Sequence, residues 1–444
     1  MRSAAFAHAP LAATSVNRFS GGLALLCAMT VVVMFTNDSA REYLKVPVGS
    51  FHLIERDFFL YPLLGAALAK VGLERRLPRV GVFGSCALAI AGLYYLYALV
   101  GLLMDGDPKA ILFHVRQVNY VLVCFPVVYF VRSHRDLVAL FSVSLICVAT
   151  SAVLTLLLAW RYADSWIALR NEFLWLTGGA HGQYFHVRLA GAFFFVIVMD
   201  CLIAMLVFRA PAMAPRRVFA LLGIVGGAMV LTVLRSLWVG MVSSLFAMWL
   251  VTRRRARFFL VTTVLAIGLG AVLLWALGDT DIGKYIHGQT QNAWDADSIA
   301  VADRMEEHRI GLAKVAESPW FGHGLGATLA VYLRSMDRTV VTSFCHNSFL
   351  TLLIFFGVVG TVFLVGVFLV ALVSGVRVSR AALRTGRRFD AAIAMGCVAG
   401  LVGLMASSVT AAALNYSTGF FFIGSVFGVL DRLHEMSDES GERP

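Results

Sequence analysis

Residues 345–373 read CHNSFLTLLIFFGVVGTVFLVGVFLVALV. After His346 and Asn347 the stretch is almost entirely apolar, and as a helix it is long enough to cross the bilayer core, which is about 30 Å thick. A long polar segment, residues 278–346, precedes it. The stretch therefore predicts a membrane helix with an ionisable histidine at its N-terminal end. Such a histidine is either an anchor at the membrane interface or part of a functional site.

The whole chain has the composition of a membrane protein. Of its 444 residues, 59% are hydrophobic and 14% are charged, and its mean hydropathy is +0.80. Apolar runs of about 17 to 25 residues recur throughout, whereas a β-barrel would show shorter alternating segments. We therefore predict an all-α polytopic membrane protein. Its expected spans, about twelve, are 20–36, 58–73, 80–104, 110–131, 136–160, 189–209, 217–234, 236–252, 258–277, 347–373, 391–411 and 414–431.

Basic residues are concentrated in alternate connections between these runs. By the positive-inside rule such connections face the cytoplasm, and so do both termini. The net charge of +11 is thereby explained without a nucleic-acid partner. The basic connections contain Arg75, Arg76 and Arg79; Arg132 and Arg135; Arg209, Arg216 and Arg217; Arg253, Arg254, Arg255 and Arg257; and Arg377, Arg380, Arg384, Arg387 and Arg388.

The other connections are expected on the outer side, and the longest of them is 278–346. Helical spacing predicts a helix over 299–316 of this loop, followed by a glycine-rich turn, WFGHGLG, and a second short helix over 327–336. The chain is thus predicted to have four parts: nine spans in 1–277, the outer loop domain in 278–346, three spans in 347–431 and a cytoplasmic tail in 432–444.

Four arginines lie on the expected outer side, namely Arg116, Arg188, Arg235 and Arg304. An arginine at this depth is costly unless it is paired or functional. Because guanidinium groups bind phosphate oxygens through two parallel hydrogen bonds, the four together predict an anionic ligand. Arg188 could instead extend to the interface, and Arg304 could pair with Glu307 or His308 one turn on. Arg235 lies between two apolar runs with no charged neighbour to neutralise it.

His346 has a second interpretation besides that of an anchor. An unperturbed histidine titrates near pH 6.5, so its ring is mostly neutral at pH 7 and able to accept a proton. Asn347 could orient this ring or the substrate. Gly357 and Gly360 are expected to let a neighbouring helix approach closely, which would hold the helix rigid beneath the histidine.

Other polar groups give weaker signals. His186 belongs to a polar cluster, residues 181–186, which either lines a sugar site or forms a hydrated loop. Asp295 and Asp297 have the spacing of a metal-binding motif of soluble nucleotide-sugar transferases, but no strand precedes them, and a solvated turn is the favoured interpretation. The seven cysteines show no metal-binding spacing. We expect neither a metal nor a cofactor.

Three stretches resemble the O-antigen ligase and O-antigen polymerase superfamily of bacterial envelope glycosyltransferases. They are LTVLRSLWVGMVSSL around Arg235, DRMEEHRIGLAKVAESPWFGHGLG after Asp303, and HNSFLTLLIFFGVVG after His346. The last is similar to the ligase pattern of histidine, a polar residue and two later glycines, and HVRLAG around Arg188 is a weaker match. The resemblance covers roughly residues 186 to 370. It departs from the family at His308, where many relatives have tryptophan.

The resemblance implies an O-antigen ligase with a fold similar to GT-C glycosyltransferases, in the bacterial inner membrane. Its donor would be polysaccharide on undecaprenyl diphosphate, and its acceptor the lipid A-core at the periplasmic face, with inversion and without metal. Arg235 and Arg304 would then clamp the diphosphate, Arg188 and Arg116 would add to the positive field, and His346 would be the general base. In this interpretation His186 and Asn347 also bind substrate.

Two rival functions stay open. The first is an O-antigen polymerase, which uses the same donor but a lipid-linked repeat as acceptor. The second is a transporter of lipid-linked sugars, whose ionisable residues would be expected near the bilayer midplane. Here Asp200 is the main charge expected at that depth, so the pattern favours chemistry at one face of the membrane.

Overall fold

The computed structural model describes most of the chain, and the described parts are 21–35, 46–48, 51–54, 56–75, 80–161, 180–181, 184–185, 192–210, 212–232, 234–252, 263, 267–268, 270–271, 299–334 and 337–439. The predicted ninth span, 258–277, lies almost wholly outside these residues. So do residues 278–298, which begin the predicted outer loop.

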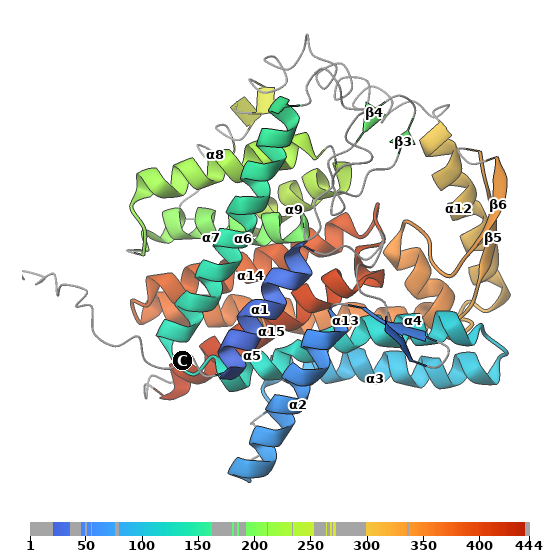
Figure 1. Cartoon of the computed structure of the whole chain (residues 1–444), viewed down its shortest axis with the longest axis horizontal. Coiled ribbons are helices and arrows are strands. Elements are labelled where there is room, and N and C mark those ends of the chain that lie inside the picture. The colour runs from blue at the N-terminus through green and yellow to red at the C-terminus, as the bar shows by residue number, and fades with distance from the viewer. Residues whose placement is uncertain are drawn as a thin grey trace, which may run out of the picture.

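The helices before the outer loop follow the predicted spans to within a few residues, because long apolar runs leave the backbone no partner but itself. They are α1 (Gly21–Phe35), α2 (Asp57–Glu74), α3 (Val82–Leu103), α4 (Pro108–Val118), the 3-10 helix η1 (Asn119–Val123), α5 (Cys124–Phe130), α6 (His134–Arg161), α7 (Ala192–Phe208), α8 (Pro215–Leu231) and α9 (Arg235–Val251). After them come α12 (Ile299–Glu317), α13 (Ser348–Arg384), α14 (Arg388–Ser407), the 3-10 helix η4 (Ala413–Asn415) and α15 (Ser417–Glu439). Figure 1 shows this arrangement.

Five helical segments in the described residues are long and apolar enough to cross a membrane. They are Val82–Leu103, Pro108–Phe130, His134–Leu157, Ser348–Arg384 and Arg388–Ser407. Shorter apolar helices include Gly21–Phe35, Phe193–Phe208 and Arg235–Val251. The class, an all-α membrane protein, is thereby confirmed, and the number of twelve spans stays a prediction.

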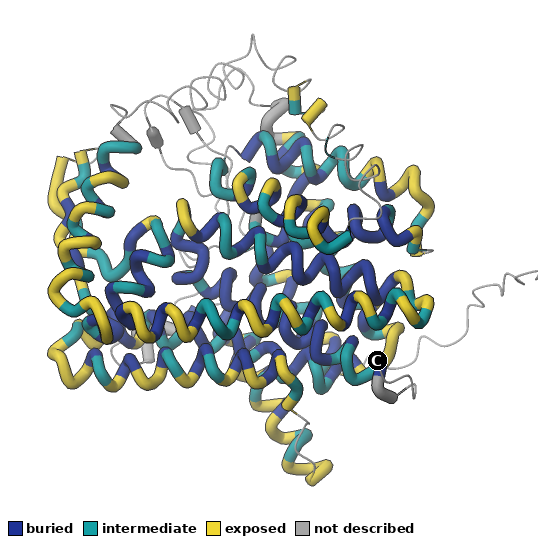
Figure 2. The backbone as a smooth tube through the Cα atoms, turned by 180° about the vertical axis from the view of Figure 1, so that it is seen from behind, coloured by how far each residue is buried: buried dark blue, intermediate teal, exposed yellow. Residues whose placement is uncertain are grey.

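Helix α14 lies at the centre of the bundle, between α7 and α15 in Figure 1, and it is largely buried in Figure 2. Small residues allow this close packing. A Cβ atom on Gly396 would lie 2.6 Å from the backbone of Cys201 in α7, and one on Gly240 of α9 would lie 2.7 Å from the carbonyl oxygen of Gly403. The helix axes therefore approach closely at these glycines, as is typical of membrane bundles.

The helix ends that carry the basic connections contact one another. Arg132 Nη2 lies 2.9 Å from Glu74 Oε1 at the end of α2, and Arg432 of α15 donates to the carbonyl oxygen of Arg132 at 2.6 Å. His134 Nδ1 at the start of α6 lies 3.1 Å from Asp390 Oδ1 of α14. One end of the bundle is thus joined through the residues predicted to face the cytoplasm.

The ends predicted to face outward also contact one another. The backbone N–H of Leu325 donates to the carbonyl oxygen of Tyr97 near the end of α3, at 2.9 Å. The N–H of Ser348, which begins α13, donates to the carbonyl oxygen of Ser408, just after α14, at 2.9 Å. These contacts agree with the alternation of helix ends predicted from charge.

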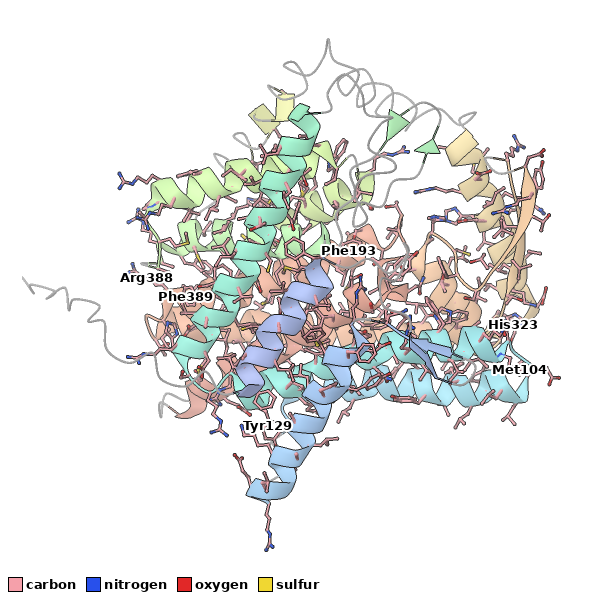
Figure 3. All side chains as sticks on the ribbon, viewed as in Figure 1. Met104, Tyr129, Phe193, His323, Arg388 and Phe389 are labelled. Atoms are coloured by element: carbon pink, nitrogen blue, oxygen red, sulfur yellow. The ribbon has the colours of Figure 1, made fainter. Side chains whose placement is uncertain are left out.

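Figure 3 shows how far apart the two ends lie. Met104 and His323 are at one end of the bundle, whereas Arg388 and Phe389 are at the other. The two sets of helix ends are therefore separated by the apolar bundle. The compartment that each end faces stays a prediction.

The outer loop differs from its prediction in one element. The helix expected over 299–316 is confirmed as α12, but the second expected helix, 327–336, is wrong. This stretch contains β5 (Leu329–Leu333), which pairs antiparallel with β6 (Arg338–Thr342). In β5 the buried and exposed residues alternate, which is the period of a strand with one face on the core. Short antiparallel pairs also join β1 (Val46–Val48) to β2 (Phe51–Leu53) and β3 (Ala180–His181) to β4 (Tyr184–Phe185).

Candidate active site

Helix α13 is broken near its start at Gly357. This residue has φ 62° and ψ −168°, which is not helical and is open mainly to glycine. The break leaves backbone groups without partners inside the helix. The N–H groups of His323 and Gly324 donate to the carbonyl oxygens of Ile354 and Phe355, at 2.8 and 3.0 Å. The glycine-rich turn thus satisfies the acceptors that the break exposes.

Carbonyl oxygens at the start of this turn also accept hydrogen bonds from the residues of α13 that follow the break. The N–H groups of Val358 and Val359 donate to the carbonyl oxygens of Pro319 and Trp320, at 2.8 and 3.1 Å. A Cβ atom on Gly357 would lie 2.4 Å from the backbone of Trp320. The expectation that Gly357 admits a neighbouring helix is therefore wrong, because the backbone of the outer loop occupies this space.

His346 is held by a carboxylate from the outer loop. Its Nδ1 atom lies 2.9 Å from both carboxylate oxygens of Glu307 in α12, and its backbone N–H donates to Glu307 Oε2 at 3.2 Å. The His346 side chain is 56% exposed, whereas that of Glu307 is 8% exposed. The ring is therefore fixed at one nitrogen while much of its surface stays accessible.

Glu307 is ionised at neutral pH. Burial on its own would raise the pKa of Glu307, but hydrogen bonds from the His346 side chain and backbone, together with the positive charge of Arg304, outweigh it and lower the pKa. A carboxylate that accepts at Nδ1 favours the neutral histidine tautomer with its hydrogen on that nitrogen. The lone pair of Nε2 is then available to accept a proton.

Arg304 lies one turn before Glu307 in α12. Its Nη1 donates to the carbonyl oxygen of Thr410 at 3.1 Å, and the side chain is exposed. Glu307 binds His346, and the positive charge of Arg304 helps to lower the pKa of Glu307. The expected alternative, a pair of Arg304 with Glu307 or His308, stays a prediction. Residues three apart share one face of a helix. The Arg304 guanidinium and the Glu307 carboxylate that binds His346 therefore lie on the same face of α12.

Arg235 is the first residue of α9, and it is half-buried. Helix α9 packs along α14, because a Cβ atom on Gly240 would meet the carbonyl oxygen of Gly403 at 2.7 Å and Ser407 Cβ at 3.4 Å. The start of α9 therefore lies beside the end of α14. The chain continues from there into residues 408–411, which Arg304 contacts.

Residues 408–411 also hold the start of α13. The N–H of Ser348 donates to the carbonyl oxygen of Ser408, and its hydroxyl donates to that of Ala411, both at 2.9 Å. Residues 408–411 are thus contacted by Arg304 of α12 and by Ser348, which begins α13 two residues after His346, and they follow the end of α14 beside which α9 begins.

Comparison with known proteins matches this part of the chain. Residues 218–365 match the model of the family described as O-antigen ligase. Over this segment the chain is similar to the O-antigen ligase family. The resemblance stated from the three sequence stretches is therefore confirmed, and the general function is of the ligase or polymerase type. A search of curated proteins gives no match.

The matched ligase segment contains Arg235, Arg304, Glu307 and His346, and it ends in the first half of α13. It also contains the glycine-rich turn and Gly357. These four residues and the break near them therefore lie in the segment that matches the family model.

Asn347 has a structural part that the sequence analysis did not assign. Its Oδ1 accepts from the N–H groups of Phe349 and Leu350, at 3.0 and 3.2 Å, so it caps the N-terminus of α13. Capping fixes the first turn of the helix directly after His346. A role of Asn347 in substrate binding stays a prediction.

Arg116 lies in α4 beside a buried carboxylate. Its Nη1 is 4.0 Å from Asp57 Oδ2, and the Arg116 side chain is 18% exposed. The hydroxyl of Tyr120 and the N–H of Ile54 also donate to Asp57, at 2.9 and 3.0 Å. Arg116 therefore shares its charge with Asp57, and its predicted contribution to an anion site is not tested by these contacts.

The other predicted substrate residues cannot be placed, since Arg188 and His186 lie outside the described residues. Asp295 and Asp297 lie outside them as well. In the part of the chain that the structure describes, no three histidine, cysteine, aspartate or glutamate side chains form a group that could hold a metal ion.

Sequence reasoning missed Glu307 as a partner of His346, because the two are separated by 39 positions. The sequence shows only that Asp303 and Glu307 are four residues apart, on one face of the predicted helix. The structure adds that both are buried, which requires partners on a neighbouring element.

Proposed function

We propose that this chain is an O-antigen ligase that transfers polysaccharide from undecaprenyl diphosphate to the lipid A-core. The observation that supports this proposal is the contact of the accessible His346 ring with Glu307, one helical turn from Arg304, whose guanidinium contacts Thr410. We propose that Arg235, the first residue of α9, joins them. The ligase family segment supplies Arg235, Arg304 and His346. Guanidinium groups suit a diphosphate, and an accessible imidazole suits a sugar hydroxyl.

Arg235 and Arg304 bind the diphosphate of the donor in this proposal. Each guanidinium offers a planar fork of donors to phosphate oxygens. The two positive charges stabilise the negative charge that builds on the diphosphate as it leaves. Arg188 and Arg116 strengthen the same field, whereas His186 and Asn347 contact the sugars.

His346 is the general base. As the acceptor hydroxyl oxygen bonds to the anomeric carbon of the donor sugar, Nε2 takes the hydroxyl proton. The bond between that carbon and the diphosphate oxygen breaks, and undecaprenyl diphosphate leaves with the bonding electrons. One displacement of this kind inverts the anomeric configuration, and the two arginines carry the charge that a metal carries in other phosphate-leaving reactions.

The site faces the periplasm in this proposal, with both termini in the cytoplasm and the chain in the bacterial inner membrane. The basic residues at the opposite end of the bundle support this orientation. The outer loop, 278–346, covers the sugars and keeps out water, whose attack would waste the donor. We also propose a relationship to the GT-C glycosyltransferases.

The test is a reconstituted assay with the purified chain in lipid nanodiscs, the lipid-linked donor and purified lipid A-core. Transfer that requires lipid A-core supports the ligase. Growth of the lipid-linked chain without lipid A-core would instead identify a polymerase. Absence of either product, together with movement of donor across the membrane when the chain is reconstituted in sealed vesicles, would identify a transporter.

A further inference from the structure

The contact between Glu307 and His346 joins two separate parts of the site. Glu307 belongs to α12 in the outer loop, and His346 precedes α13. The carboxylate receives both the ring Nδ1 and the backbone N–H of His346. Two contacts to one residue fix the ring and the chain that carries it, so the direction of Nε2 is determined.

Helix α12, which contains Glu307, packs in direct contact with the start of α13, which follows His346. A Cβ atom on Gly311 of α12 would lie 2.7 Å from Leu350 Cδ2 in α13 and 3.4 Å from Cys345 Sγ. Cys345 is buried, and its N–H donates to Thr351 Oγ1 at 3.0 Å. The spacing between α12 and the start of α13 is therefore set by direct contact.

The charged and titratable groups that face Glu307 come from both of these elements. His346 contacts it directly, Arg304 adds a positive charge from its own helix, and the Cys345 thiol lies near it. Burial and the nearby Glu307 together raise the pKa of Cys345 to about 12, so the thiol stays neutral. The negative charge of Glu307 is therefore stabilised by the hydrogen bonds from His346 and by the positive charge of Arg304.

We propose that Glu307 is a positioning residue for the transfer reaction, which holds the His346 ring with Nε2 toward the acceptor and stabilises the imidazolium formed by proton transfer. This inference rests on the proposed function, in which His346 is the base. A buried carboxylate is costly unless it is paired, and here the partner is the exposed ring at the site. An accessible ring with one fixed nitrogen is the arrangement that a general base requires.

The experiment compares Glu307→Gln with Glu306→Gln in the nanodisc assay. Glu306 is the neighbouring residue in α12, and its carboxylate pairs with Arg309 on the exposed face. We expect Glu307→Gln to lower the transfer rate by about 10²-fold, at the low end of the general-base contribution, and Glu306→Gln to leave it unchanged. Equal rates for the two variants would overturn the inference.

The kinetic constants separate positioning from structural support. Glu307→Gln should lower kcat while the KM for the lipid-linked donor stays that of the wild type, because Arg235 and Arg304 bind the donor in the proposal. An unchanged kcat with a raised KM would contradict the proposal.

A double variant tests whether Glu307 acts through His346. The residual rate of Glu307→Gln combined with His346→Ala should equal that of His346→Ala alone, because one interaction cannot be removed twice. A further loss would contradict the inference. If Glu307→Gln melts well below Glu306→Gln, then Glu307→Asp is measured instead. Its rate should lie between those of the wild type and Glu307→Gln, because the charge is kept while the shorter side chain holds the ring less well. A wild-type rate for Glu307→Asp would contradict fixed positioning.

These outcomes separate the inference from the proposed function. A wild-type chain that transfers nothing would remove the proposed function itself. A wild-type chain that transfers, with an inactive His346→Ala variant and a fully active Glu307→Gln variant, would remove only the role of Glu307.

Discussion

Gly322 of the outer loop packs into the break that Gly357 makes in α13. A Cβ atom on Gly322 would lie 2.4 Å from the carbonyl oxygen of Phe355 and 2.6 Å from the N of Gly357. Both glycines have positive φ. The break and the turn that fills it therefore depend on each other, and together they fix the first half of α13, which begins two residues after His346.

Gly357→Ala should destabilise the protein. Alanine at positive φ costs roughly 1–2 kcal/mol, and the added Cβ meets the Trp320 backbone at 2.4 Å, so we expect a clear fall in melting temperature. Thermal unfolding in detergent measures it. Gly366→Ala is the matched control, since a Cβ there meets nothing within 4 Å. An equal melting temperature for both variants would contradict the packing described.

Arg235→Lys should lose most of its transfer activity although it keeps its charge. Lysine offers a point charge instead of a planar fork and cannot bind two phosphate oxygens in the same way. The initial rate with lipid-linked donor should fall by at least about tenfold, while the protein melts as the wild type does. Arg209→Lys, in the connection predicted to face the cytoplasm, is the control. A rate near that of the wild type would show that Arg235 does not form a fork with the diphosphate.

Excess EDTA should leave the rate of transfer unchanged, because the proposal assigns the stabilisation of the diphosphate to guanidinium groups. The measurement is the initial rate before and after removal of divalent ions, with added Mg²⁺ as the restoring control. Loss of activity that Mg²⁺ restores would give the acidic residues of the outer connections, such as Asp295 and Asp297, a role in metal binding.

The stability of the protein should depend on Glu307 in a defined pH range. Its pKa is lowered in the folded state from an ordinary value of 4.5, so its stabilising contribution is present above that value and is lost as the pH falls through the folded pKa. The melting temperature should therefore fall by less in Glu307→Gln than in the wild type as the pH is lowered from about 5 to about 3. The opposite order would contradict the ionised state of Glu307.

Local pattern predicted the helices before the outer loop, because an apolar run of this length must satisfy its own backbone in a membrane. The roles of the arginines and of His346, which the same pattern suggested, stay predictions. The cap at Asn347 was also readable, since an asparagine before an apolar helix is a start signal. The hairpin of β5 and β6 was missed because a stretch as short as 327–336 fits helical and strand periods almost equally well.

Long-range pairing accounts for what the sequence did not reveal. Glu307 and His346 meet only because Gly311 lets α12 lie against Leu350 and Cys345. Likewise, the partner of Gly357 is a loop more than 30 positions earlier in the chain. A glycine in an apolar run predicts close approach, but the identity of the approaching backbone follows from the tertiary fold.

The most direct test of the central claim is the initial rate of polysaccharide transfer to lipid A-core by His346→Ala, measured beside His308→Ala as a control from the same region. If His346 is the general base, its variant retains the melting temperature of the wild type and loses transfer by about 10²-fold or more, while His308→Ala transfers normally. A His346→Ala variant that transfers at the wild-type rate would contradict the account.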